Sequence, residues 1–256
     1  MLALKLLLVP AFLWLVSAAG TRWGPSVAGW LAGLPVVGGP ILFFIAIEHG
    51  SRFASDAAAA ALAAVFASIS FNLAYAHAAQ RMGWPASLAL ALLAWGLAAV
   101  GLARLPGSVW ASLCVATIAL TAAPSVFPIV AHESEPRAMD RTEIALRMVA
   151  GALLTLAVTC TAGRLGQAWS GLFAVFPVLG CVLAVFTHRG QGAAHAARLL
   201  RAMAAGLYAF ATFCFTLSVS LPRFGVAQAF IAATTLALLV QTVTRRHARG
   251  VAAATR

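Results

Sequence analysis

The chain has 256 residues, of which 62% are apolar and only 9% are charged, and its mean hydropathy is +0.96. A soluble domain carries about a quarter charged residues and about half apolar ones. The composition therefore excludes a soluble enzyme, a disordered chain and a secreted disulfide scaffold. It predicts a protein that crosses a membrane several times.

The charge is strongly positive, with 17 Lys and Arg against 6 Asp and Glu and a net charge of +11. The basic residues stand singly between apolar runs or near the C-terminal end, where lipid phosphates attract them. The stacked aromatic and basic surface of a nucleic-acid-binding protein is missing outside the apolar runs. We therefore expect membrane lipids as partners and no nucleic acid.

Nine apolar runs follow one another along the chain, and each is suited to one crossing, because a membrane-spanning helix needs about 20 apolar residues. Helices satisfy their own backbone hydrogen bonds in lipid. The sequence thus predicts an all-α polytopic transmembrane bundle of about nine spans. The runs cover residues 2–19, 27–47, 56–79, 86–103, 108–130, 143–161, 169–187, 199–221 and 225–243.

The first run also has features of a secretory signal peptide, namely Lys5, an apolar stretch and small residues at 17–19. An internal repeat favours a retained span. Shifting the sequence by 142 positions places residues 21–50 opposite 163–192, and nine of these 30 pairs are identical. They are Arg22/Arg164, Gly24/Gly166, Gly29/Gly171, Ala32/Ala174, Pro35/Pro177, Val36/Val178, Gly38/Gly180, Phe44/Phe186 and Gly50/Gly192.

The same shift pairs Arg81 with Arg223 and sets Lys5 opposite Arg147, so the first run corresponds to the sixth. The repeat predicts three parts: a first four-span unit in 1–105, a connector span with a cytoplasmic loop in 106–142, and a second four-span unit with a basic tail in 143–256. Five crossings separate equivalent points, and an odd number reverses direction. The two units are therefore predicted to be inverted repeats.

The basic residues divide unevenly between the two sides of this topology. One side holds five, which are Lys5, Arg52, Arg104, Arg164 and Arg223, and the other side holds the remaining twelve. The richer side is expected to be cytoplasmic. This places the N-terminus on the outer side and the C-terminus on the cytoplasmic side of a bacterial inner membrane.

Two spans are interrupted at matching places, at Pro35 with Gly38 and at Pro177 with Gly180. Proline removes a backbone donor and clashes with the preceding turn, which predicts a kink or an unwound turn. Broken helices hold the substrate in transporters with inverted repeats. A packing role is the other interpretation, because Gly29 and Gly33 allow two helices to approach closely.

Four arginines precede a bulky apolar residue and a glycine just before a span: Arg22, Arg81, Arg164 and Arg223. A guanidinium and the donors of the coming helix favour a phosphate or carboxylate there. The simpler interpretation is that these side chains reach the lipid head groups.

Polar residues inside spans are site candidates, because burying them in lipid is costly. Asn72 and Tyr75 are three residues apart and are expected to face a common interior. Glu48 ends the second run and can reach Arg52 in the following loop, where a plain interfacial ion pair is favoured.

Catalytic and cofactor motifs are missing from the sequence: it holds no H-E-x-x-H, G-x-S-x-G, P-loop or dinucleotide fingerprint. His188 and His195 lack a suitable third ligand nearby. We therefore expect no enzymatic activity, no cofactor and no bound metal.

Three segments resemble a known family: residues 170–177 (SGLFAVFP), 187–190 (THRG) and 206–210 (GLYAF). They are similar to small bacterial inner-membrane proteins of the GlpM type, a family linked to alginate production. The likeness covers most of the second unit and implies a cell-envelope context, without catalytic residues to carry over.

The sequence favours a small secondary transporter or flippase-like carrier for an anionic or amphipathic solute, with its site between the two interrupted spans. The alternative is a non-transporting membrane subunit of a cell-envelope polysaccharide system. That subunit would form a homo-oligomer or bind an envelope-complex partner.

Overall fold

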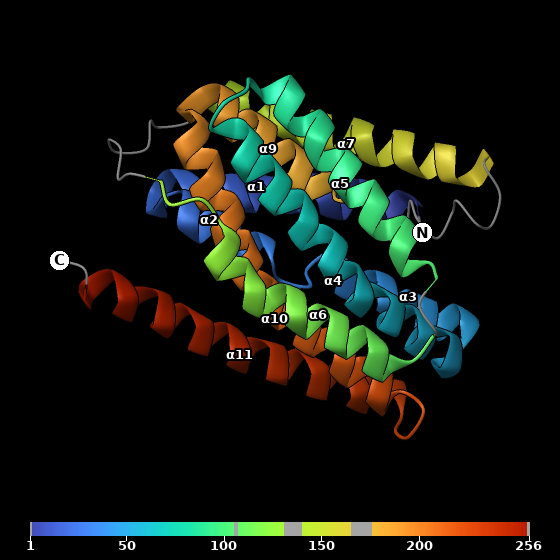
Figure 1. The fold of residues 1–256 in the computed structure, drawn as a ribbon. Coiled ribbons are helices and arrows are strands. Elements are labelled where there is room, and N and C mark those ends of the chain that lie inside the picture. Colours follow the sequence, from blue (N-terminus) through green and yellow to red (C-terminus); the bar gives the residue numbers. More distant parts are fainter. Residues whose placement is uncertain (1, 105–106, 131–139, 165–175, 255–256) are drawn as a thin grey trace.

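The computed structural model describes residues 2–104, 107–130, 140–164 and 176–254 (Figure 1), and these contain helices and no strand. Seven of the helices are long and apolar enough to cross a membrane, as a polytopic membrane protein requires. They are α1 (Leu2–Trp23), α4 (Ser51–Ala79), α5 (Trp84–Leu102), α6 (Val109–Val126), α7 (Arg141–Arg164), α10 (Ala193–Ser220) and α11 (Val226–Ala254).

Two of the nine predicted runs are not single long helices. Run 27–47 forms α2 (Pro25–Ala32) and α3 (Gly38–His49), joined by a turn at 33–37. In Figure 1, α2 begins where α1 finishes, and α3 finishes at the other end of the bundle, where α4 begins. Run 169–187 lies partly outside the described residues, and its remainder belongs to α9 (Val178–Gln191).

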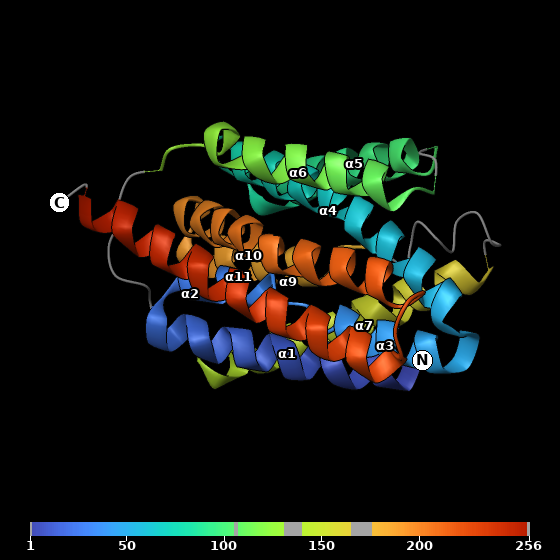
Figure 2. The ribbon, with the colours of Figure 1, turned by 90° about the horizontal axis from the view of Figure 1, so that it is seen from below.

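The centre of the bundle is the pair α4 and α10, which pack along each other (Figure 2). About half of the residues in these two spans are buried, against fewer than a quarter in α5, α7 and α11. Helix α5 packs on α4 and α11 packs on α10, while α1 packs on α7. The core therefore depends on two long helices that the outer helices cover.

Helix boundaries recur at the spacing of the sequence repeat. Helices α4 and α10 begin at Ser51 and Ala193, and α5 and α11 begin at Trp84 and Val226, in both cases 142 residues apart. The glycines before α4 and α10 have φ of 85° and 92°, which a residue with a Cβ rarely adopts. Helices α1 and α7 run in opposite directions in both views.

Helix α2 lies on α10 with the two backbones in direct contact. A methyl group at Gly29 would overlap the Leu199 carbonyl, and one at Gly33 or Gly206 would overlap the facing backbone. Small residues at helix interfaces in membranes allow this close approach. The packing interpretation of Gly29 and Gly33 is confirmed.

Helix α6, the predicted connector, is fixed to the central pair through its carbonyl groups. Pro124 has no N–H, so the Leu120 carbonyl one turn earlier lacks its helical partner. The Tyr208 hydroxyl of α10 donates to that carbonyl at 2.9 Å. His77 of α4 donates from Nε2 to the Val126 carbonyl at 2.8 Å.

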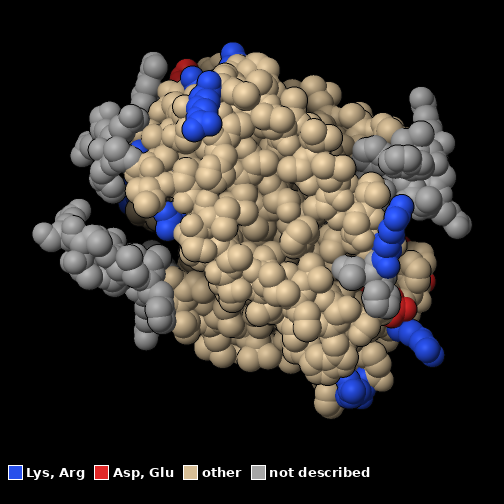
Figure 3. Space-filling model, in the orientation of Figure 1, with Lys and Arg blue, Asp and Glu red and all other residues tan. Residues whose placement is uncertain are grey.

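Charged and apolar side chains occupy different parts of the described surface. On the face shown in Figure 3, the Lys and Arg side chains lie toward the two ends, and the middle is uncharged. Large apolar side chains such as Leu97, Trp110 and Ile231 are more than 60% exposed. Such a surface suits a protein surrounded by lipid tails.

We predict that Gly206→Ala destabilises the protein, because the added methyl group would meet the Trp30 carbonyl. Overpacking of this kind costs about 1–3 kcal/mol. SDS-induced unfolding in detergent measures the change. Gly96→Ala is the matched control, since nothing lies within 4 Å of a methyl group there. Equal stabilities of the two variants would contradict the direct α2–α10 contact.

Candidate binding site

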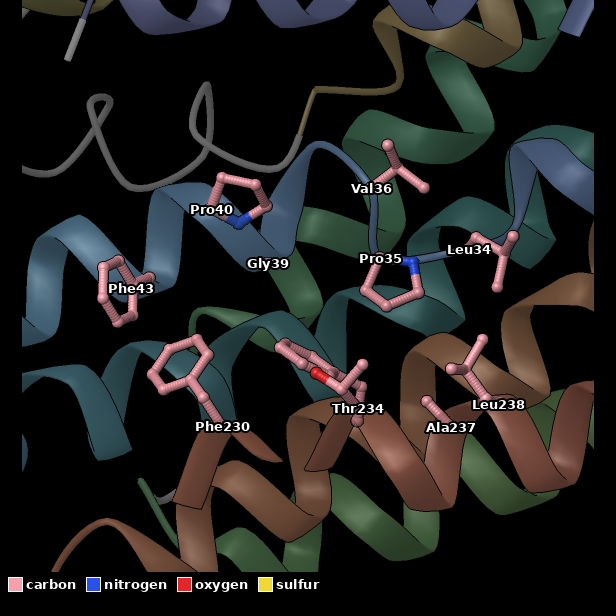
Figure 4. A pocket seen from close by; sticks show the side chains of 11 residues that line it. Leu34, Pro35, Val36, Gly39, Pro40, Phe43, Phe230, Thr234, Ala237 and Leu238 are labelled. Carbon is pink, nitrogen blue, oxygen red and sulfur yellow. The ribbon is translucent and has the colours of Figure 1, made fainter. Parts of the chain in front are cut away.

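A cavity of about 420 Å³ opens beside the break between α2 and α3 (Figure 4). Its walls come from this break and from α10 and α11. Among the described lining residues only Thr234 has a polar side chain, so the cavity suits an apolar group. The lining consists of Leu34, Pro35, Val36, Gly39, Pro40, Phe43, Phe213, Phe230, Thr234, Ala237 and Leu238.

The break itself follows from Pro35, which cannot donate a backbone hydrogen bond. The Leu34 N–H donates to the Leu31 carbonyl at 3.0 Å, which ends α2 in a tight turn. The Gly39 N–H then donates to the Pro35 carbonyl at 2.7 Å and starts α3. The chain thus changes course in five residues and leaves room beside Pro35.

Glycine at positions 38 and 39 brings α3 onto two rings of α10. A Cβ at Gly38 would lie 3.0 Å from the Phe210 ring, and one at Gly39 would lie 3.5 Å from the Phe213 ring. Phe213 also packs edge-on against Phe230 of α11, with 6.0 Å between ring centroids. Pro35 therefore lines the cavity directly, whereas Gly38 fixes the helix behind it.

Gln241 of α11 bonds to the backbone of α2 near its C-terminal end. The carbonyl of Trp30 lacks its usual helical partner, because the Leu34 N–H bonds to Leu31 instead. Gln241 is 3% exposed and donates from Nε2 to this carbonyl at 3.1 Å. The sequence marks Gln241 only as a polar residue within a span, since its partner is 211 residues away.

The second break shares one backbone hydrogen bond with the first. The Cys181 N–H donates to the Pro177 carbonyl at 2.9 Å, 142 residues after the Gly39–Pro35 bond. A Cβ at Gly180 would lie 3.2 Å from the Phe71 ring of α4. The two breaks thus pack on different helices of the central pair, and the described cavity belongs to the first break.

Phe176, directly before Pro177, is covered by Trp95 of α5. Their ring centroids are 5.2 Å apart with the planes at 71°, an edge-on contact. Trp95 is 7% exposed. An aromatic pair therefore lies directly beside the second break.

The arginines selected from the sequence lie at helix ends, and the three with described side chains are exposed away from the cavity lining. The Arg22 guanidinium lies over the Trp23 ring, 5.8 Å from its centroid. Arg223 donates to the Val219 carbonyl at 2.6 Å. Arg81 is exposed after α4, and the side chain of Arg164 lies outside the described residues.

Glu48 is exposed at the end of α3 and forms no ion pair with Arg52 among the described residues. Gly50, with φ of 85°, turns the chain between the two helices. Arg52 belongs to the first turn of α4 rather than to a loop. The expected interfacial pair is therefore not formed.

Asn72 and Tyr75 are both buried in α4, at 1% and 0% exposure. The Tyr75 hydroxyl lies 3.4 Å from Nδ1 of His188 on α9. Asn72 Nδ2 has no hydrogen-bond partner within the described part of the chain. The two residues share the interior as expected, and they lie apart from the cavity lining.

A half-buried ion pair, Glu143 with Arg147, was not recognised as such in the sequence. Arg147 is 1% exposed, and its Nη2 donates to Glu143 Oε1 at 2.7 Å. Its guanidinium lies 5.7 Å from the centroid of the Phe186 ring on α9. The i, i+4 spacing is the signal that could have identified this pair.

Among the described residues, no three His, Cys, Asp or Glu side chains form a group that could hold a metal ion. No family model, no curated protein and no solved structure matches the chain. The site is therefore interpreted from its own chemistry.

We predict that Glu143→Gln lowers the free energy of unfolding, because Arg147 then stays buried without a countercharge. Breaking a fully buried pair costs about 3–5 kcal/mol, and we expect about 1–3 kcal/mol because the Glu143 side chain is 28% exposed. Unfolding in SDS measures the effect, with Glu48→Gln as the exposed control. Adding Arg147→Met should restore most of the stability, and a double variant as unstable as Glu143→Gln would contradict this explanation.

Proposed function

We propose that the protein is a small membrane carrier of flippase-like type that moves an amphipathic solute. The observation that carries this proposal is the apolar cavity at the Pro35 break. Thr234, in its wall, lies near the middle of the 19-residue apolar span Val226–Thr244 of α11. A helix interrupted at this depth beside a cavity is the arrangement in which transporters bind substrate.

The lining favours an amphipathic solute over a small anion. Its walls offer proline, phenylalanine and leucine side chains and one hydroxyl, and no charged group among the described residues. An isolated anion would lose its hydration there without a countercharge. The exposed arginines at the helix ends suit a charged head group at the membrane surface.

An inverted repeat supports a carrier, because two opposed halves can expose one site to each side in turn. Three observations support the inversion: the helix starts at one common spacing, the opposite directions of α1 and α7 in Figures 1 and 2, and the contacts of α1 with α7 and of α4 with α10. The proposal counts nine crossings, with run 27–47, which holds α2 and α3, and run 169–187, whose described part includes α9, added to the seven long apolar helices.

A second candidate function is a non-transporting subunit of a cell-envelope polysaccharide system in a bacterial inner membrane. The backbone contact of α2 with α10 favours it, since packing this close resists the movement of a carrier. The GlpM-type resemblance of the second half points to the same context. Such a subunit would co-purify with another membrane protein and would not move lipid.

We predict that the purified protein in liposomes moves fluorescent phosphatidylglycerol across the bilayer. Pro35→Ala and Pro177→Ala should slow this movement by about tenfold or more, because each restores a helical turn at a break. Dithionite quenching of the outer leaflet measures the rate. Pro85→Ala is the control, because Pro85 lies in the first turn of α5, where proline is tolerated.

Two outcomes would contradict the carrier. Lipid movement that is unchanged in both break variants would remove the breaks from the mechanism. A wild-type protein that is folded and moves no lipid would favour the subunit function.

We also predict the orientation, with the end richer in arginine in the cytoplasm. In a chain whose four native cysteines are replaced by alanine, Arg52→Cys should react with an impermeant maleimide in intact cells. Arg22→Cys should react only after lysis, since α1 ends at the opposite side. The reverse pattern would invert the topology.

A further inference from the structure

The two breaks differ in what fills the space beside them. At the repeat spacing of 142 residues, Ala237 corresponds to Trp95, and Leu34 corresponds to Phe176. Leu34 and Ala237 line the open cavity. Phe176 and Trp95 pack against each other, with ring centroids 5.2 Å apart.

One backbone hydrogen bond recurs after both prolines, while the described side chains beside them differ. The hydrogen bonds Gly39–Pro35 and Cys181–Pro177 have lengths of 2.7 and 2.9 Å. Each break also rests on a corresponding ring, Phe213 for the first and Phe71 for the second. Ala237 thus leaves a space beside the first break, where the second break has the indole of Trp95 and the ring of Phe176.

We infer that the cavity at Pro35 holds one hydrocarbon chain of an amphipathic molecule, in the place that Trp95 and Phe176 fill by themselves at the second break. Residues 95 and 237 then determine which of the two breaks binds the chain. This inference rests on the proposed function and names the part of the solute that enters the cavity.

A hydrocarbon chain suits the apolar walls of the cavity. The cavity also opens toward the outer surface of the bundle, where lipid tails lie. Three lining residues are exposed on the outer surface: Val36 at 39%, Phe43 at 37% and Leu238 at 53%. A chain can therefore enter from the surrounding lipid without passing a charged group. The apolar indole and phenyl groups at the second break show that this kind of space accepts a large apolar group.

The test is photolabelling of the full-length protein in detergent with palmitic acid that carries a diazirine in the middle of its chain. Labelled peptides are mapped by mass spectrometry. The wild type should be labelled around Phe43 and Phe230, which lie 5.2 Å apart by ring centroid at the cavity. Ala237→Trp should reduce this labelling to background, because the indole fills the cavity.

Ala232→Trp is the matched control, because Ala232 is an exposed alanine on the same helix and outside the cavity lining. It should leave the labelling unchanged. Trp95→Ala provides an independent test that does not depend on the folding of Ala237→Trp. It should create new labelling around Phe176, where the wild type has none.

Equal labelling of the wild type and a folded Ala237→Trp variant would overturn the inference, as would a Trp95→Ala variant without new labelling. Labelling spread along all lipid-exposed helices would indicate only contact with bulk amphiphile and would also overturn it. If the labelling follows the expected pattern but the protein moves no phosphatidylglycerol, the hydrocarbon-chain site stands and the carrier function is contradicted.

Discussion

The direct backbone contact between α2 and α10 is the constraint on which the rest of the structure depends. In lipid, apolar surface alone does not drive helices together, so close packing and satisfied backbone groups must do so. Gly29, Gly33 and Gly206 allow this contact. It positions the end of α2, and therefore the break at Pro35, directly beside the central helix.

A break in a helix within a membrane is stable only if other groups satisfy the freed backbone. At the first break a tight turn bonds Leu34 to Leu31, and Gln241 of α11 bonds to the Trp30 carbonyl. Pro124 in α6 likewise leaves the Leu120 carbonyl without its helical donor, and the Tyr208 hydroxyl of α10 donates to that carbonyl. In both places a polar side chain from a distant helix compensates for a proline and at the same time fixes the packing.

The described surroundings of the two breaks differ in side-chain chemistry. The first break has an apolar cavity beside it. Beside the second break Trp95 contacts Phe176, and the pairs Tyr75–His188 and Glu143–Arg147 lie toward the end of α9. The cavity could not be inferred from the repeat alone, because identical prolines mark both breaks.

The sequence by itself determined the membrane class, the helical architecture, the interrupted second run and the repeat spacing, because apolar length, proline and glycine act locally along the chain. It could not place Gln241 on Trp30 or Arg147 beside Phe186, since these contacts join helices far apart in sequence. It also expected a Glu48–Arg52 pair, which the turn at Gly50 does not form. Only the tertiary structure decided that the breaks pack on different central helices and that one of them opens a cavity, because side-chain volumes from α5, α10 and α11 fill or leave that space.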